Sequence, residues 1–322
     1  MAVVSDQLVT VFGGSGFVGR HAVRSLAKRG YRLRVAVRRP DLAQYLMTAG
    51  AVGQVSAVQA NLRYPDSVEA AVDGADAVIN LVGIMHERGR NTFEATQAFG
   101  AGAVARAAKA AGVSTLIQMS AIGANKDSAS GYAVSKAKGE EAVLAAFPGA
   151  AILRPSVMFG PEDDFFNRFA AMAQMSPVLP LVGGGETKFQ PVFVGDVAEA
   201  IAAGVDGRLA PGATYELGGP KVLTFRQILE FVLKVTNRSR ILAPLPFGIA
   251  GLIARVAQYL PNPPLTPSQV TLLKSDNVVS AEAIAQRRTL EAIGITPTSI
   301  EAEVPAYLWR FRKSGQFEKM PI

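Results

Sequence analysis

The chain has 322 residues, of which 49% are apolar and 18% charged, so its composition is that of a globular protein and excludes a disordered one. It contains no cysteine and two histidines, which excludes disulfides, catalytic thiolates and cysteine-bound clusters and leads us to expect no metal site. The formal net charge of +7 favours an anionic partner, such as a phosphate-bearing cofactor, an acidic protein surface or anionic lipid.

The first predicted elements are a strand, a glycine turn and a helix. Residues 8–12 are a short apolar run, GGSGFVG follows, and the next residues have helical spacing up to a closing glycine. The three spaced glycines would permit a sharp turn, the approach of a pyrophosphate and close packing of helix on strand. The helix start would offer free N–H groups to the phosphates. The predicted cofactor contacts of this turn are Gly13, Ser15, Gly16, Phe17 and Gly19.

The second strand, 31–37, bears on the choice of cofactor. NAD-specific sites usually end this strand with an acid that binds the ribose 2′-hydroxyl. Here the strand ends in Arg38 and Arg39, and Asp41 lies beyond a proline. Because a guanidinium binds phosphate oxygens in a fork, the two arginines favour the 2′-phosphate of NADP(H). A solvated basic loop is the alternative.

Strands and helices then alternate along the chain, with strands predicted at 55–62, 76–83 and 114–123 and helices at 65–72 and 91–112. This alternation predicts an α/β, Rossmann-like, doubly wound parallel sheet. Ligands of such sheets bind at the carboxyl ends of the strands. The residues expected at those ends are Asn61, Leu62, Leu81, Val82, Gly83 and Ser120.

A possible catalytic group follows Ser120. Tyr132 and Lys136 are four residues apart on a predicted helix and therefore share a face. The ammonium would lower the pKa of the phenol and make it an acid at neutral pH, while also reaching a ribose. Ser120 would then bind a substrate carbonyl. Two surface residues on an amphipathic helix are the alternative.

The chain beyond 155 predicts a smaller C-terminal α/β domain of the substrate-binding type. We place an NADP-binding domain at 1–155 and this second domain at 156–322, with some sheet elements interleaved with the first. The three phenylalanines at 165, 166 and 169 would line a substrate lid, anchor a partner or, as we favour, form helix core.

Residues 244–260 include an apolar helix that is too short to span a bilayer. It would be buried against its own domain, buried against a partner or dipped into lipid, and its single arginine argues against the last. The proline-rich segment after it, 261–267, reads as a stiff connector. The tail, 306–322, mixes aromatic and basic residues, which suit a membrane interface or an acidic groove, or else a fraying terminal helix.

These motifs resemble the short-chain dehydrogenase/reductase superfamily in its extended or atypical branch. The resemblance covers roughly 5–240 and rests on the glycine turn, Leu81-Val82-Gly83, Ser120, the Tyr132/Lys136 pair and the segment ILRPSVMFGP. In that superfamily the last segment carries a proline loop beside the nicotinamide. The resemblance therefore implies that Pro155 and Ser156 contact the cofactor.

Three longer phrases resemble a narrower family, the NADPH-binding accessory subunits of respiratory complex I of the alpha subcomplex subunit 9 type, with their bacterial relatives. The phrases are RPSVMFGPEDDFFNRFAAM, KFQPVFVGDVAEAI and LEAIGITPTSIEAEVPAYLWRFR. This resemblance implies a tightly held NADPH with little turnover and attachment to core subunits near the junction of the two arms. It also implies a peripheral position on the cytoplasmic face of a bacterial inner membrane or on the mitochondrial matrix side.

The presence of Ser120, Tyr132 and Lys136 also fits an active NADP-dependent reductase or epimerase-like enzyme. The short spacing between Ser120 and Tyr132 leaves open whether Ser120 or a serine of 128–130 would face a substrate. No segment is typical of a signal peptide, a membrane span or a nucleic-acid-binding motif. We therefore expect a peripheral protein without a nucleic-acid partner.

Overall fold

The computed structural model describes residues 5–260 and 265–317, in two compact units that we treat separately. Unit 1 comprises the chain up to Arg154 together with 195–217 and 281–296. Unit 2 comprises the remaining segments, 155–194, 218–280 and 297 onward. The segments 195–217 and 281–296 therefore return to unit 1 from the second half of the chain.

A seven-stranded sheet forms the centre of unit 1, in the order β11-β6-β5-β4-β1-β2-β3. Its strands are β1 Leu8–Phe12, β2 Arg32–Val37, β3 Val55–Gln59, β4 Ala77–Asn80, β5 Thr115–Met119, β6 Ala151–Pro155 and β11 Thr214–Leu217. The pairs among β1 to β6 are all parallel. The order reverses at β1 and β4, which is the point where doubly wound sheets bind ligands. The predicted Rossmann-like architecture is confirmed.

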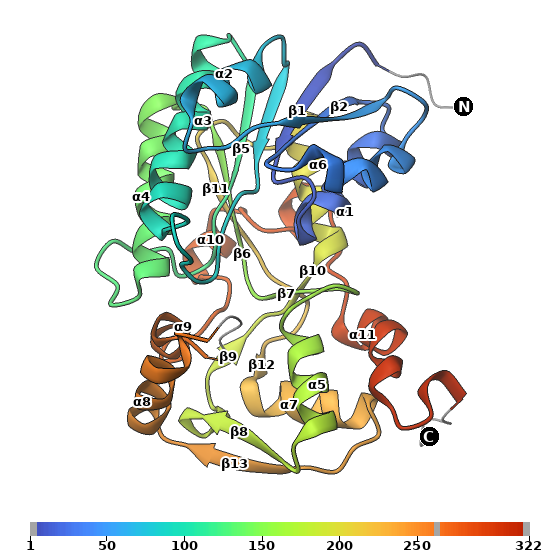
Figure 1. The fold of residues 1–322 in the computed structure, drawn as a ribbon, viewed down its shortest axis with the longest axis vertical. Helices are drawn as coiled ribbons and strands as arrows, with labels where there is room; N and C mark the ends of the chain where they lie inside the picture. The colour runs from blue at the N-terminus through green and yellow to red at the C-terminus, as the bar shows by residue number, and fades with distance from the viewer. Residues whose placement is uncertain (1–4, 261–264, 318–322) are drawn as a thin grey trace. The chain divides into compact units, whose positions relative to one another are not determined.

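Helices cover both faces of this sheet (Figure 1). On one side lie α2 Pro65–Val72, α3 Gly100–Ala110 and α4 Gly131–Ala146, and on the other α1 Phe17–Lys28 and α6 Val194–Val205. Short helices complete the unit: η1 Pro40–Ala49, η2 Glu94–Phe99, α10 Ala281–Ala285 and η4 Glu291–Ile293. Arg29, directly after α1, pairs with Glu199 of α6 at 2.6 Å, which ties the returning segment to the N-terminal part of the unit.

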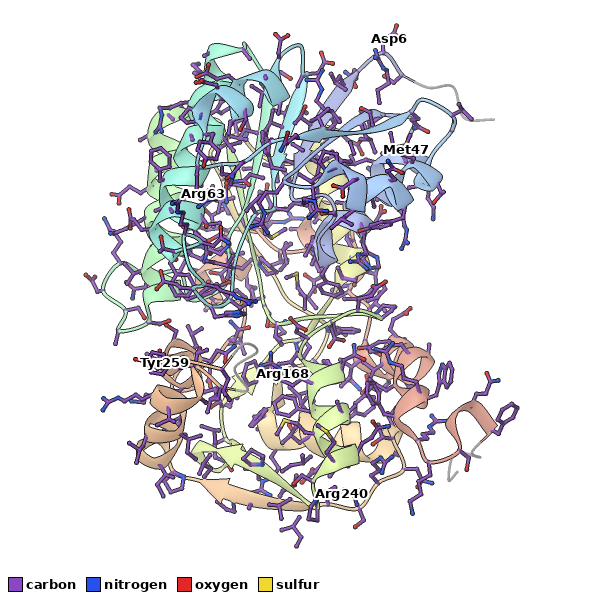
Figure 2. All side chains as sticks on the ribbon, viewed as in Figure 1. Asp6, Met47, Arg63, Arg168, Arg240 and Tyr259 are labelled. Carbon is purple, nitrogen blue, oxygen red and sulfur yellow. The ribbon has the colours of Figure 1, made fainter. Side chains whose placement is uncertain are left out.

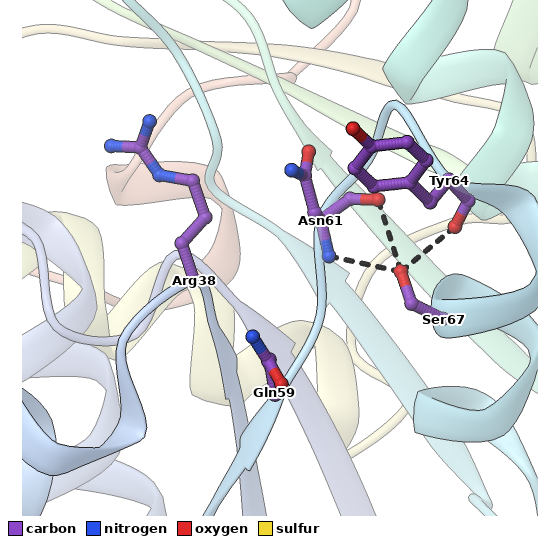
Figure 3. A pocket seen from close by; sticks show the side chains of 5 residues that line it. All are labelled: Arg38, Gln59, Asn61, Tyr64 and Ser67. Carbon is purple, nitrogen blue, oxygen red and sulfur yellow. Dashed lines mark hydrogen bonds between the residues drawn. The ribbon is translucent and has the colours of Figure 1, made fainter.

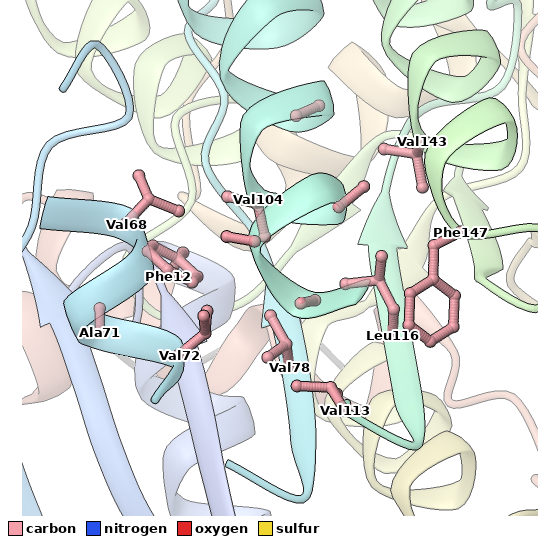
Figure 4. Close-up of a cluster of buried hydrophobic side chains, with 14 of the residues drawn as sticks. Phe12, Val68, Ala71, Val72, Val78, Val104, Val113, Leu116, Val143 and Phe147 are labelled. Atoms are coloured by element: carbon pink, nitrogen blue, oxygen red, sulfur yellow. The ribbon is translucent and has the colours of Figure 1, made fainter. Parts of the chain in front are cut away.

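The core beneath α2, α3 and α4 is built from small and branched side chains (Figure 4). Val78 of β4 and Val104 of α3 are fully buried, and Phe12 is 1% exposed. The alanine-rich face of α3 lets the helix approach the sheet closely, because small side chains leave little volume between backbones. This packing fixes the carboxyl ends of β1, β4 and β5, where the candidate site lies.

Unit 2 contains three two-stranded sheets and several helices. The pairs are β7 Met158–Phe159 with β10 Val192–Phe193, β8 Val178–Val182 with β13 Ile241–Leu245, and β9 Lys188–Phe189 with β12 Leu223–Thr224. The helices are α5 Phe166–Met175, α7 Phe225–Val235, α8 Phe247–Ala257, α9 Pro267–Leu272 and α11 Ile300–Leu308, with the short turns η3 Gly183–Gly185, η5 Trp309–Phe311 and η6 Gly315–Phe317.

Aromatic rings form the core of unit 2. Phe166 is fully buried, and Phe165 and Phe169 pack against the same cluster with edge-to-face ring contacts. The interpretation of these three residues as helix core is therefore confirmed, and none of them forms an exposed anchor. Thr224 caps α7 in a capping box with Gln227, as its position before the helix predicted.

The described part of the tail is bound to unit 2 by its basic side chains. Arg312 donates to the carbonyl of Val235 at 2.8 Å, and Arg310 donates to Asn167 at 2.6 Å. Two of the basic groups that suggested a membrane or an acidic partner are thus bound within unit 2. The rest of the tail and most of the predicted connector, 261–264, lie outside the described residues.

A buried carboxylate links α11 to the loop before α5. Asp163 is 3% exposed and accepts hydrogen bonds from the Tyr307 hydroxyl at 2.6 Å and from the backbone N–H groups of Gly160 and Asn167. Burial raises the pKa of Asp163, while these three hydrogen bonds act in the opposite direction. The carboxylate therefore depends on its donors to remain charged.

Replacing Tyr307 by phenylalanine is expected to lower the free energy of unfolding by about 2 kcal/mol at neutral pH, because a hydrogen bond to a buried charge is lost. The substitution raises the pKa of Asp163 in the folded state further above its unfolded value. A group with a raised folded pKa makes the folded state less stable as pH rises through that range. The loss of unfolding free energy is therefore larger at neutral pH than at acid pH. Urea unfolding at both pH values measures this, with Tyr215→Phe, which loses a bond from a backbone N–H, as control. An equal loss at both values would contradict the account.

Candidate cofactor site in unit 1

The glycine turn after β1 closes tightly on itself and on the end of β4. Gly13 has φ +77°, and a Cβ there would lie 3.2 Å from Val82 Cγ2 and 3.3 Å from the Leu81 carbonyl carbon. A Cβ on Gly19 would lie 2.3 Å from the Gly13 carbonyl oxygen, so only glycine fits at that position. Gly16 stands at the N-cap of α1 and has no side chain that could cap the helix. Its first N–H groups are therefore available to an anion.

Two side chains that sequence reasoning missed hold the turn from outside. Tyr45 donates its hydroxyl to the Ser15 carbonyl at 2.9 Å, and Arg20 donates to the same carbonyl at 3.4 Å and to Gly16 at 3.3 Å. The guanidinium of Arg20 also lies over the Tyr45 ring. The spacing of four between Gly16 and Arg20 was the only signal for this contact, since it lets a long side chain reach back one helical turn.

A cavity of about 200 Å³ opens between the carboxyl ends of β2 and β3 (Figure 3). Its lining residues are Arg38, Gln59, Asn61, Tyr64 and Ser67. Ser67 accepts from the Asn61 N–H at 3.0 Å and fixes that corner. Within the described residues, no carboxylate pairs with Arg38. The cavity therefore presents a guanidinium and several neutral hydrogen-bonding groups at the place where the sequence predicted a 2′-phosphate.

Arg39 takes no part in this cavity. Its guanidinium pairs with Asp41 at 2.8 Å, and both side chains are exposed, at 68% and 56%. The ion pair lowers the pKa of Asp41, chiefly through the hydrogen bond from Arg39. The two arginines, equivalent in the sequence, are thus separated, and Arg38 alone of the two is left to meet an anion in the cavity.

The side chain of Lys136, on α4, reaches the carboxyl end of β5. Its side chain is buried, and its ammonium donates to the Met119 carbonyl at 3.3 Å and would lie 3.3 Å from a Cβ on Gly83. Burial lowers the pKa of Lys136 to about 8, against the attraction of Glu140. Because Gly83 follows directly on the residues that touch Gly13, the glycine turn, the 81–83 segment and Lys136 form one continuous surface.

The prediction that Lys136 lowers the pKa of Tyr132 was wrong. Burial raises the pKa of Tyr132 to about 12, and the ring packs edge-to-face on Phe93. The ammonium lies 5.9 Å from the centre of the Tyr132 ring and binds Met119 instead. Desolvation of the phenol therefore sets the direction of its pKa shift, and the phenol stays protonated at neutral pH.

Three buried polar atoms of unit 1 have no hydrogen-bond partner among the residues that the structure describes. They are Ser120 Oγ, Ser130 Oγ and Gln97 Oε1, and each of their residues is less than 5% exposed. Buried polar atoms without a partner are rare, and a water, an ion or a ligand can satisfy them. Both serines that the sequence left open thus keep a free hydroxyl. Gln97 lies on η2, a stretch of π-helix, and was not predicted.

The remaining predicted contacts fall in different places. Phe17 stands at the start of α1 against His21, and Leu62 is 7% exposed within the core of unit 1. Pro155 and Ser156 belong to unit 2, where the Ser156 hydroxyl lies 2.7 Å from Asn277 Oδ1.

Within the described residues, no helix is both long and apolar enough to cross a bilayer.

Comparison with known proteins places this geometry in a family. Residues 9–218 match the model of the NAD dependent epimerase/dehydratase family. Over 320 residues the chain is 36% identical to NADH dehydrogenase (ubiquinone) 1 alpha subcomplex subunit 9, mitochondrial, of Arabidopsis thaliana, covering 97% of this chain and 80% of the relative. It is also 36% identical over 203 residues to a ceramide reductase of Caulobacter vibrioides, covering 63% of this chain and 62% of that protein.

Among solved structures, the NADPH-dependent quinone oxidoreductase QOR2 of Escherichia coli, complexed with NADPH, has the same fold. The TM-score is 0.73 at 22% sequence identity, over 94% of this chain and 99% of that one. The glycine turn, the strand order and these matches agree with one another. The chain belongs to the NAD dependent epimerase/dehydratase family, the extended branch of the short-chain dehydrogenases/reductases, and resembles subunit 9 proteins along nearly its whole length.

Proposed function

We propose that this protein is an NADPH-binding accessory subunit of respiratory complex I, NADH:ubiquinone oxidoreductase, in which the cofactor is mainly a structural element. The observation that carries the proposal is the similarity to the Arabidopsis subunit, which runs through both units of the chain. The ceramide reductase match spans a smaller share of the chain. A ligand held tightly by the folded state stabilises it by mass action, without any turnover.

The residues of unit 1 fit the proposed cofactor. Gly13, Gly16 and Gly19 form a cradle that a Cβ would obstruct, and the first turn of α1 would hold the diphosphate. Arg38 would bind the 2′-phosphate in the cavity that Asn61 also lines. Lys136 and Tyr132 would hold the nicotinamide ribose next to the 81–83 segment.

The α8 helix supplies a candidate docking surface for the rest of the complex. Its alanines at 250, 254 and 257 are buried, while Leu252 is 65% and Val256 71% exposed. Tyr259, just beyond the helix, is 85% exposed (Figure 2). The helix's own unit thus covers only its alanine side. We propose that a protein partner, a core subunit near the junction of the arms, covers the aliphatic side, because one arginine is too little for an anionic lipid surface.

This function is tested by gentle detergent solubilisation of native membranes that carry a tagged copy of the chain. We expect the quinone-reducing core of complex I to co-elute, together with bound NADPH. A protein that elutes without partners and exchanges NADPH readily would overturn the proposal. The expected location is peripheral, on the cytoplasmic face of a bacterial inner membrane or on the matrix side of a mitochondrial one.

A double variant, Leu252→Ser with Val256→Ser, is expected to lower the amount of co-eluting complex I about tenfold, since two exposed aliphatic contacts of an interface core are lost. Its NADPH content should not change, because α8 carries none of the predicted cofactor residues. Val52→Ser, at a fully exposed valine of unit 1, is the matched control. Unchanged co-elution of the double variant, or binding to bare anionic vesicles instead, would contradict a protein partner on α8.

A second candidate, an NADP-dependent reductase of the extended short-chain type, is favoured by Ser120, Tyr132 and Lys136 and by the ceramide reductase relative. A bound nicotinamide would supply hydride to a carbonyl. In this reading the free Ser120 hydroxyl would orient the carbonyl oxygen, and the phenol of Tyr132 would hold the proton that the oxygen receives. NADPH oxidation with a carbonyl substrate that disappears in Tyr132→Phe would establish it.

A further inference from the structure

Glu140 lies one helical turn after Lys136 on α4 and is the nearest acid on the same face. Without another cation bound to it, a buried Glu140 carboxylate at this spacing would attract the Lys136 ammonium. The ammonium instead lies at the strand ends, with Met119 as its hydrogen-bond acceptor and Gly83 beside it. Something other than the sequence of the helix therefore determines where the Lys136 side chain is held.

Arg154 of β6 binds both carboxylate oxygens of Glu140. Its Nε donates to Glu140 Oε1 at 2.8 Å and its Nη2 to Oε2 at 2.6 Å, so both carboxylate oxygens are engaged. The Glu140 side chain is 9% exposed, and Arg154 Nη1 also lies 3.8 Å from Glu216 of β11. A planar guanidinium that binds a buried carboxylate with two parallel bonds is a strong, well-oriented pair.

We propose that Arg154 is a positioning residue for the cofactor site: by holding Glu140 in this two-pronged ion pair, it keeps the carboxylate from capturing Lys136 and leaves the ammonium directed at the cofactor's ribose. The ribose contact rests on the proposed function, whereas the effect on Lys136 itself does not. The pair thus connects α4 and β6 to the surface on which a dinucleotide would lie.

The charged and titratable groups around Lys136 are few within the described residues. Tyr132 and Glu140 face it from α4, and Arg154 and Glu216 stand behind Glu140 on β6 and β11. On the solvent side of α4, Lys138 pairs with Glu94 of η2 at 3.2 Å. From α3, Arg106 lies over the Phe99 ring. Glu140 is therefore the charge most able to change the state of Lys136.

The first test titrates Lys136 in the cofactor-free full chain by NMR of labelled lysine side chains, with Lys136→Arg to assign the signal. In Arg154→Met the freed carboxylate stabilises the ammonium, and we expect the pKa of Lys136 to rise by about one unit. In the double variant Arg154→Met, Glu140→Gln position 140 carries no charge, and the pKa of Lys136 should return to the wild-type value or below it, since Glu216 stands farther away, behind position 140. If the Arg154–Glu140 pair only stabilises the fold, the pKa of Lys136 will not change, or will change by the same amount in both variants.

The second test measures the dissociation constant of NADPH for the same proteins from neutral to alkaline pH. Arg154→Met should weaken binding about tenfold at neutral pH, because the ammonium is withdrawn from the ribose, and the double variant should restore most of the affinity. Loss of affinity in both variants would overturn the inference. If the wild type binds no dinucleotide, the proposed function fails, while the lysine titration still decides the role of Arg154. Arg154→Lys, which retains the charge but engages one oxygen, serves if Arg154→Met does not fold.

Discussion

Replacing Gly19 by alanine is expected to abolish dinucleotide binding and to lower the free energy of unfolding by about 3 kcal/mol. The added methyl would lie 2.3 Å from the Gly13 carbonyl oxygen and 2.5 Å from Gly14 Cα, and both are backbone atoms that cannot move independently. Alanine improves helix propensity by about 1 kcal/mol, which is too little to offset this clash. The helix must shift away from β1, and the cradle for the phosphates is lost with it.

Chemical denaturation and a titration with NADPH measure the two effects. Gly149→Ala is the matched control, since it adds the same methyl to unit 1 where the nearest side-chain atom is 3.7 Å away. The control should bind as the wild type does and unfold within about 0.5 kcal/mol of it. Full affinity in Gly19→Ala would show that the turn does not hold the cofactor.

The nucleotide-binding half of the fold was predictable because its signals are local. The strand at 8–12 is observed with the predicted bounds, and the helix at 65–72 likewise, since apolar runs and an N-terminal proline mark them within a few residues. Strand ends were less well predicted, as β3 ends at Gln59 and β4 at Asn80, where the chain leaves the sheet toward the site. The sequence remains apolar beyond the ends of β3 and β4, because the residues that follow these strands are also at least partly buried.

The helix predicted at 91–112 illustrates what the sequence alone does not contain. It divides into η2, a π-helical stretch over 94–99, and α3, because long-range packing overrides the regular period. Gly139 of α4 approaches the Gln97 carbonyl so closely that a Cβ there would lie 2.2 Å from it. That contact joins residues far apart in the chain, and it places the unpaired Gln97 amide oxygen near Lys136.

The sequence predicted which residues belong to the candidate site more accurately than it predicted the contacts between them. The spacing of Tyr132 and Lys136 gave their shared helix, but not the burial that raises the pKa of the phenol. The two arginines after β2 were indistinguishable until the structure paired Arg39 with Asp41. Arg154 was visible only as part of a family-like segment, since its partner Glu140 lies on another element. Distances between side chains of different elements are set by the whole core, not by local sequence.

Replacing Arg38 by glutamate is expected to weaken NADPH binding about 100-fold, because a charge-assisted contact to the 2′-phosphate becomes a repulsion. Arg38 lines the cavity at the ends of β2 and β3, and no carboxylate among the described residues competes for it. NADH lacks the 2′-phosphate, so its dissociation constant should change less than threefold or so, or improve, since glutamate can accept from a ribose hydroxyl.

Titrations of both dinucleotides against the wild type, Arg38→Glu and Arg39→Glu measure this. Arg39 is the matched control because it stands next in the chain but is exposed and paired with Asp41, and its loss should change NADPH affinity less than about threefold. Equal losses of NADPH and NADH in Arg38→Glu would show that the cavity holds some part of the dinucleotide other than the 2′-phosphate. A loss in Arg39→Glu instead would mean that Asp41 releases its arginine when the phosphate arrives, and that the specificity of the site belongs to that exchange.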